Sequence, residues 1–187
     1  NRMMAGEENI LWNTPIYWFA KSSGTTSDKS KFIPISEESL KDIHFKASKD
    51  VLTNYYKNFP DSDLLTGKSL VVGGSHQVHS IDEDIQYGDL SAVLMQNTPF
   101  WGHWIRTPEL SIALLDEWER KIEQLAASTI NENVTSLAVV PTWTIILIKR
   151  ILEIFGKKTL KEVWPNLELY MHGGVSFTPY REQLSKL

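Results

Sequence analysis

The chain has 187 residues, a net charge of −4 and no cysteine. No basic block stands out, which argues against a nucleic-acid partner, and a chain without cysteine has neither disulfides nor thiolate metal sites. The longest apolar stretch, 137–148, is interrupted by Pro141 and Thr142 and is too short to span a bilayer. With no secretory signal at the start of the sequence, we expect a cytoplasmic protein with one core and no membrane partner.

The first predicted elements are two short apolar strands, 16–20 and 32–35, which flank the polar loop SSGTTSDKSK at 22–31. Glycine lets a backbone approach an anion closely, and successive N–H groups and hydroxyls then point at its oxygens. Lys31 adds a charge-assisted hydrogen bond. The pattern predicts a phosphate-binding loop, although the same residues also favour an ordinary polar hairpin. It is not a Walker A loop, which needs a second glycine and a following helix.

Helices and strands then alternate along the chain. Ser36 is a good N-cap for an amphipathic helix that ends near residue 58. In the helical region 107–130, Glu117 and Lys121 are expected to pair on a solvated face. The helix 142–155 is apolar all round, so it should be buried and end at Gly156. The other predicted elements are strands at 68–72, 134–140 and 167–172, and helices at 88–97 and from Thr178 onward.

This alternation predicts an α/β fold with a mixed, largely parallel sheet and flanking helices. Ligands of such sheets bind outside the carboxyl ends of the strands. The segment HGGVSFTPY at 172–180 follows the last strand, and its paired glycines would let a flat ring lie against the backbone. The alternative for this segment alone is an ordinary turn between a strand and a helix.

The segment FAKSSGTTSDKSKFIPIS at 19–36 resembles the phosphate-binding motif of the GH3 family, the acyl acid amido synthetases of the acyl-adenylating superfamily. Residues 22–26 and Lys31 match in type and order, whereas Ser27-Asp28 stands where a further glycine is usual. The strand that ends at Val140-Pro141 and the turn HGGVSFTPYREQ resemble the superfamily's Val-Pro element and adenine-binding turn. The amino-acid sequence of that turn is similar to that of bacterial-type members of the family.

The resemblance implies an enzyme that activates a small carboxylic acid with ATP and Mg²⁺ and then joins the acyl group to an amino acid. It implies three groups of site residues: Ser22, Ser23, Gly24, Thr25, Thr26 and Lys31 at the phosphates; Gly173, Gly174, Val175 and Ser176 at adenine or ribose; and Met95 and Trp143 in the acyl pocket. Residues 1–187 are interpreted as an internal piece of the N-terminal adenylating domain, without the C-terminal domain. We expect such a piece to lack a complete site, and either to self-associate or to adopt only part of the parent arrangement.

Two alternatives stay open. An acyl-CoA ligase or another thioester ligase would share the adenylation step, and a catalytically inactive binding module would keep the fold. The complete set of hydroxyls at 22–26 argues against the inactive module, and Asp28 argues for it.

The histidines predict no metal site. His76 and His79, near Asp82, Glu83 and Asp84, match no zinc pattern, so we expect a solvated loop or the lip of a substrate pocket there. His44, His103 and His172 are expected to be packed or hydrogen-bonded rather than catalytic.

Overall fold

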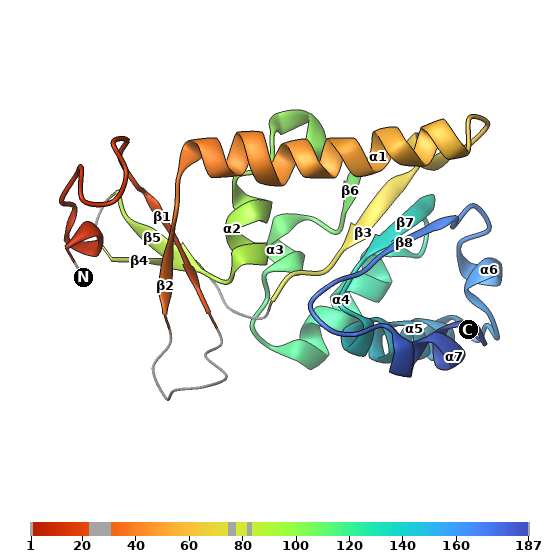
Figure 1. The fold of residues 1–187 in the computed structure, drawn as a ribbon. Coiled ribbons are helices and arrows are strands. Elements are labelled where there is room, and N and C mark those ends of the chain that lie inside the picture. Colours follow the sequence, from red (N-terminus) through yellow and green to blue (C-terminus); the bar gives the residue numbers. More distant parts are fainter. Residues whose placement is uncertain (1, 23–30, 75–77, 82–83, 187) are drawn as a thin grey trace. The chain divides into compact units, whose positions relative to one another are not determined.

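A computed structural model of the chain describes residues 2–22, 31–74, 78–81 and 84–186 (Figure 1). The chain divides into two compact units. Unit 1 comprises residues 1–61 and 76–98, and unit 2 comprises residues 62–75 and 99–187. Each unit has its own sheet and its own buried cluster, so the single core expected from the length is divided in two.

Unit 1 contains a mixed sheet of four strands in the order β2-β1-β5-β4. Strand β1 pairs antiparallel with β2 and parallel with β5, and β4 pairs antiparallel with β5. A small cluster of Ala20, Ile35, Leu40 and Val93 joins the sheet to its helices. The elements are η1 (Met3–Ala5), β1 (Trp18–Lys21), β2 (Phe32–Ile35), η2 (Ser39–Phe45), α1 (Lys46–Asn58), β4 (His79–Ser80), β5 (Gln86–Gly88) and α2 (Leu90–Gln96).

The predicted cap of the long helix in unit 1 is confirmed, because the Ser36 hydroxyl accepts the N–H of Ser39 at 3.1 Å. The segment η2 near the start of this helix is a π-helix, and the α-helix α1 continues from Lys46. A pattern with a period of 3.6 residues does not distinguish the wider π turn from an α turn.

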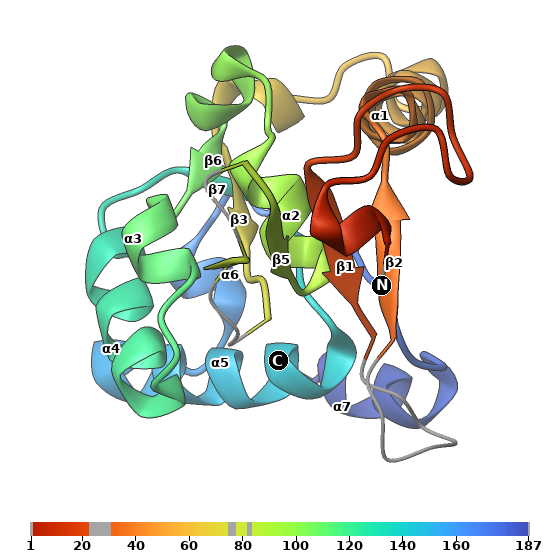
Figure 2. The same ribbon diagram turned by 90° about the vertical axis from the view of Figure 1, so that its left-hand side faces the viewer.

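Unit 2 contains an all-parallel sheet in the order β6-β3-β7-β8. Helices α4 and α5 lie against one side of it in Figures 1 and 2. Leu70 of β3, Leu125 of α4 and Ile151 of α5 are each 0% exposed in the core between them. The elements are η3 (Leu64–Thr66), β3 (Lys68–Val71), η4 (Phe100–His103), β6 (Arg106–Thr107), α3 (Leu110–Ala113), α4 (Trp118–Thr129), β7 (Val134–Ala138), α5 (Pro141–Phe155), α6 (Leu160–Val163), β8 (Leu169–Met171), η5 (Thr178–Tyr180) and α7 (Arg181–Leu184).

Two predictions for the helices of unit 2 need correction. The region 107–130 is not one helix, because α3 ends at Ala113 and α4 begins at Trp118. No glycine or proline marks that break. Helix α5 ends as predicted, with Gly156 at φ 60°, but it is not buried all round: Ile146 is 49% and Ile154 is 42% exposed.

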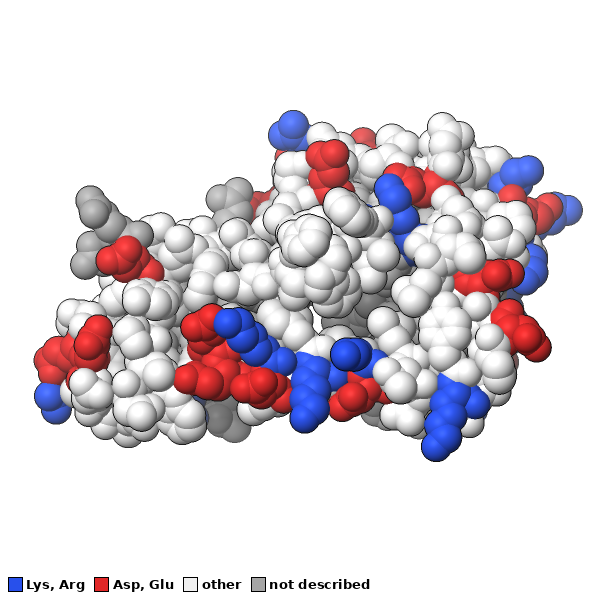
Figure 3. Space-filling model, turned by 90° about the horizontal axis from the view of Figure 1, so that it is seen from above, with Lys and Arg blue, Asp and Glu red and all other residues white. Residues whose placement is uncertain are grey.

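The charged side chains of both signs are interspersed on the face of the molecule shown in Figure 3. Within the described residues, no helix combines the length and the apolar character needed to cross a membrane.

Candidate functional site

The predicted phosphate loop joins two paired strands. In the β1–β2 hairpin, Lys21 lies opposite Phe32. At the next position Ser22 N–H donates to the carbonyl of Lys31 at 2.8 Å, and Lys31 N–H donates to the hydroxyl of Ser22 at 3.3 Å. The first and last residues of the predicted site therefore face each other. Ser23, Gly24, Thr25 and Thr26 lie outside the described residues, so their roles stay predictions.

The sheet of unit 1 explains why this hairpin is anchored. Strand β1 is an inner strand between β2 and β5, and Phe19 on it is 2% exposed. The ring of Phe32 packs edge-on against Tyr87 of β5, with 5.1 Å between the ring centres. A loop carried by such strands has a fixed base, as a phosphate-binding loop requires.

The predicted adenine turn lies at the carboxyl edge of the parallel sheet in unit 2. Because all four strands run in the same direction, the segments after β3, β7 and β8 emerge at one edge. The turn 173–176 follows β8 and is exposed to solvent. Gly174 has φ 79°, a left-handed conformation that favours glycine.

Val140, which follows β7, lies beneath this turn. A Cβ atom added to Gly174 would lie 3.6 Å and 3.7 Å from the two methyl groups of Val140, whereas a Cβ on Gly173 would meet nothing within 4 Å. The Val-Pro element and the glycine turn, which the sequence predicts as two parts of one site, are therefore neighbours.

Aromatic side chains flank the glycine turn on both sides. The rings of His172 and Phe177 stack with 4.2 Å between centres and 17° between planes. The ring of Tyr170 lies 5.3 Å from that of His172, and the guanidinium of Arg181 lies 5.6 Å from the ring centre of Phe177. His172 is thus packed against a ring, as expected, although its side chain is exposed.

Sequence reasoning missed Tyr170. Its hydroxyl donates to the carbonyl of Val139 at 3.0 Å and lies 2.9 Å from the hydroxyl of Thr144. Burial is the main reason that the pKa of the Tyr170 phenol is raised. Its position on the last strand, two residues before the histidine of the turn, is the only signal in the sequence.

Lys121 was misassigned to a solvated face. It is 0% exposed, and its ammonium donates to the carbonyls of Gly74 at 3.1 Å and Gly73 at 3.5 Å. A buried ammonium needs such partners, and these two carbonyls belong to the segment that follows β3. The spacing to Leu125 and Thr129, which are also buried on α4, indicated the correct face.

The two residues predicted for the acyl pocket lie in different units. Met95 is 5% exposed on α2 of unit 1. Trp143 is half-buried on α5 of unit 2, and its ring lies 5.3 Å from that of Trp118. Their roles toward an acyl group stay predictions.

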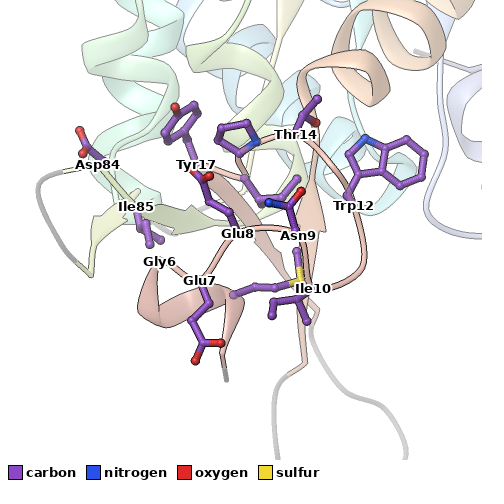
Figure 4. A pocket seen from close by; sticks show the side chains of 13 residues that line it. Gly6, Glu7, Glu8, Asn9, Ile10, Trp12, Thr14, Tyr17, Asp84 and Ile85 are labelled. Carbon is purple, nitrogen blue, oxygen red and sulfur yellow. The ribbon is translucent and has the colours of Figure 1, made fainter.

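Two hollows in unit 1 contain none of the predicted site residues. Figure 4 shows the first, of about 220 Å³, between the segment that begins at Gly6 and the approach to β5 at Asp84 and Ile85. The second, of about 330 Å³, is mainly apolar and is lined by Leu11, Trp12 and Ile43 among others.

The side chains of His79 and His103 also have neighbours. The ring of His79 lies 5.2 Å from that of Tyr87, and Nδ1 of His103 lies 3.1 Å from a guanidinium nitrogen of Arg106. Among the described residues, no three His, Asp or Glu side chains are grouped so that they would hold a metal ion. His76, Asp82 and Glu83 lie outside that part of the chain.

Comparison with known families decides the assignment. The family model described as the GH3 family N-terminal domain matches residues 1–187, the whole chain. The chain belongs to the GH3 family. No curated protein sequence matches it.

Solved GH3 structures share the fold of this chain. One, described as AtGH3.15 acyl acid amido synthetase in complex with 2,4-DB, has a TM-score of 0.77 at 17% identity and is matched over 99% of the present GH3 chain. Another, described as GH3.15 acyl acid amido synthetase, has a TM-score of 0.71 at 16% identity over 100%. The present chain spans 41% of each solved chain. The predicted α/β class is confirmed.

Proposed function

We propose that this GH3 chain forms the nucleotide-binding part of an acyl acid amido synthetase. In the proposed reaction, a carboxylate oxygen of a small acid attacks the α-phosphorus of ATP, and pyrophosphate leaves. The amine of an amino acid then attacks the acyl carbon, an amide forms, and AMP leaves. The observation that carries the proposal is the match of the GH3 N-terminal domain over the whole chain, which includes both predicted nucleotide segments.

The proposed phosphate contacts come from the β1–β2 loop. Adenylation creates charge on the phosphate oxygens and on the leaving pyrophosphate, so catalysis rests on positioning and on stabilisation of that charge. Ser22, whose backbone is fixed against Lys31, would start a run of hydroxyl and N–H donors through Thr26. The ammonium of Lys31 would neutralise charge at the β- or γ-phosphate.

The proposed adenine or ribose contacts come from residues 173–176. The backbone at Gly173 has open space where a Cβ would stand, so a flat base could approach it closely. Val140 supports the turn from below.

Mg²⁺ enters the proposal with ATP, bound by phosphate oxygens. The described residues offer no cluster of carboxylates to hold it, so we assign it no ligand from this part of the chain. The cytoplasmic location also stays a prediction.

The decisive experiment is acid-dependent exchange of labelled pyrophosphate into ATP, run on the full-length protein against a panel of carboxylic acids. Exchange with at least one acid is expected, followed by amide formation when amino acids are added. A thioester with coenzyme A in place of an amide would favour the alternative ligase. ATP binding without exchange for any acid would favour the inactive module.

A further inference from the structure

We propose that Tyr170 is a positioning residue for the nucleotide turn: it ties residues 172–177 to the junction between β7 and α5. The inference rests on the proposed function, because the proposed function assigns this turn to the nucleotide. It goes further because it explains how an exposed, glycine-rich segment keeps one conformation.

The hydroxyl of Tyr170 binds the β7–α5 junction at two points. It donates to the carbonyl of Val139, just beyond the end of β7, and lies 2.9 Å from the hydroxyl of Thr144 in the first turn of α5. Thr144 in turn lies within hydrogen-bond distance of the carbonyls of Val140, at 3.0 Å, and Val139, at 3.4 Å. These polar groups therefore form one network around the Val139-Val140 peptide.

The ring of Tyr170 contacts the turn. It lies 5.3 Å from His172 and 6.2 Å from Phe177, and these two rings stack on each other across the glycines. The turn is thus held from two directions, by the ring stack at its ends and by Val140 beneath Gly174. Tyr170 contacts the ring stack and also binds the carbonyl of Val139, the residue that precedes Val140.

The Tyr170 hydroxyl fixes the orientation of the ring through its hydrogen bonds and adds little buried apolar area. Replacement of Tyr170 by phenylalanine keeps the ring and its packing, so the variant should fold. The carbonyl of Val139 then loses its 3.0 Å donor, and the ring is free to shift with the stack that rests on it. We expect the turn to sample more conformations, only one of which suits a bound nucleotide.

The test compares Tyr170→Phe, Thr144→Val and the double variant of the full-length protein. Tyr17→Phe, the same chemical change at a 53% exposed tyrosine of unit 1, is the control. For each protein we would measure the KM values for ATP and acid by pyrophosphate exchange, and amide hydrogen exchange in the peptide that covers 172–177.

The expected result for Tyr170→Phe is a rise in the ATP KM of about three- to tenfold, as for the loss of one hydrogen bond. The KM for the acid should not change, and hydrogen exchange at 172–177 should accelerate. Thr144→Val should act in the same direction, and the double variant should be no worse than the stronger single variant, since both remove the same link.

Three results would overturn the inference. Unchanged hydrogen exchange at 172–177 would show that Tyr170 does not position the turn, and the proposed function would stand. Faster exchange with an unchanged ATP KM would show that the turn does not hold the nucleotide, so the proposed role of 173–176 would fail. A lower kcat with both KM values unchanged would indicate a purely structural residue.

Discussion

Lys31 contributes its backbone to the hairpin, and its side chain is the one proposed to bind phosphate. The two bonds with Ser22 use backbone groups of Lys31, so Lys31→Ala should keep the hairpin and the melting temperature. The variant should lose about 10- to 150-fold in kcat/KM for pyrophosphate exchange, because a hydrogen bond to a charged group is worth roughly 1.5–3 kcal/mol.

Lys21→Ala is the matched control for this prediction. It removes the same charge from an exposed position on β1, next to Ser22, and we expect little change in kcat/KM. Equal losses in the two variants would point to a general charge effect. A loss confined to amide formation, with pyrophosphate exchange intact, would remove Lys31 from the phosphate site.

Alanine substitution can distinguish the roles of the two glycines in the turn. Gly174→Ala should lower the free energy of unfolding by about 1 kcal/mol, since φ 79° is strained for a residue with a Cβ. Gly173→Ala should leave stability unchanged, because its Cβ would meet nothing within 4 Å. If adenine lies against the turn, that Cβ occupies the space of the base.

Thermal unfolding and calorimetric titration with ATP would test both glycine variants. The expected pattern is weaker ATP binding with an unchanged melting temperature for Gly173→Ala. Normal ATP binding by a stable Gly173→Ala protein would move the nucleotide away from this face of the turn.

At the scale of an element, helix α6 begins with a capping box that depends on a charged carboxylate. The carboxylate of Glu162 accepts the N–H groups of Lys158 at 2.8 Å and Thr159 at 3.0 Å. These backbone hydrogen bonds are the main reason that the pKa of Glu162 lies below its ordinary value of 4.5. The charged form is therefore stabilised by folding.

The stability of the wild-type protein relative to Glu162→Gln should depend on pH in a defined direction. Since the pKa is lowered in the folded state, the stabilisation is complete above about 4.5 and is lost as the pH falls through the folded-state value. Melting temperatures at pH 7 and pH 3 would test this. A gap between the two proteins that is the same at both pH values would exclude the carboxylate charge as the cause.

Elements with a strong local signal were predicted, and elements made by distant pairing were not. Helix α5 and its Gly156 end have both an apolar pattern and a terminator. Strand β5, with only Gln86, Tyr87 and Gly88, has no alternation of its own and is a strand because it pairs with Trp18, Phe19 and Ala20. Such pairing is decided by residues far away in the sequence.

The same distinction applies to the site. The loop at 22–31 and the turn at 173–176 could be predicted because motifs specify local backbone geometry, and their roles stay predictions. The supporting contacts of Tyr170 and Lys121 join segments from different strands and helices. The spacing on α4 indicates which face Lys121 occupies, but no spacing identifies binding partners on distant segments, so these contacts needed the structure.

At the scale of the whole molecule, the 187-residue chain studied alone is expected to self-associate. Leu11 is 76%, Ile43 is 62% and Phe100 is 73% exposed. In addition, the edge strands of the two sheets in the described part of the chain are β2, β4, β6 and β8. Exposed apolar side chains and sheet edges both favour association, so light scattering should show species larger than a monomer.

The double variant Leu11→Ser, Ile43→Ser provides the comparison, since both residues line the same apolar hollow of unit 1. We expect it to shift the distribution toward monomers at equal concentration. A monomeric wild-type chain that binds ATP with micromolar affinity would contradict the prediction of self-association and of an incomplete site.

Because the two units are interleaved along the chain, the ribosome begins unit 2 before it completes unit 1. Residues 62–75, which carry β3, are synthesised before residues 76–98 complete unit 1. Lys68 pairs with Val134 on β7, so about 66 residues separate the partners, or roughly 3–13 s of translation at 5–20 residues per second. Until β7 is made, the only strand partner of Leu70 in the described sheet is Thr107 on the edge strand β6. The nascent chain must therefore keep β3, with its fully buried Leu70, from aggregating while a different unit is being completed.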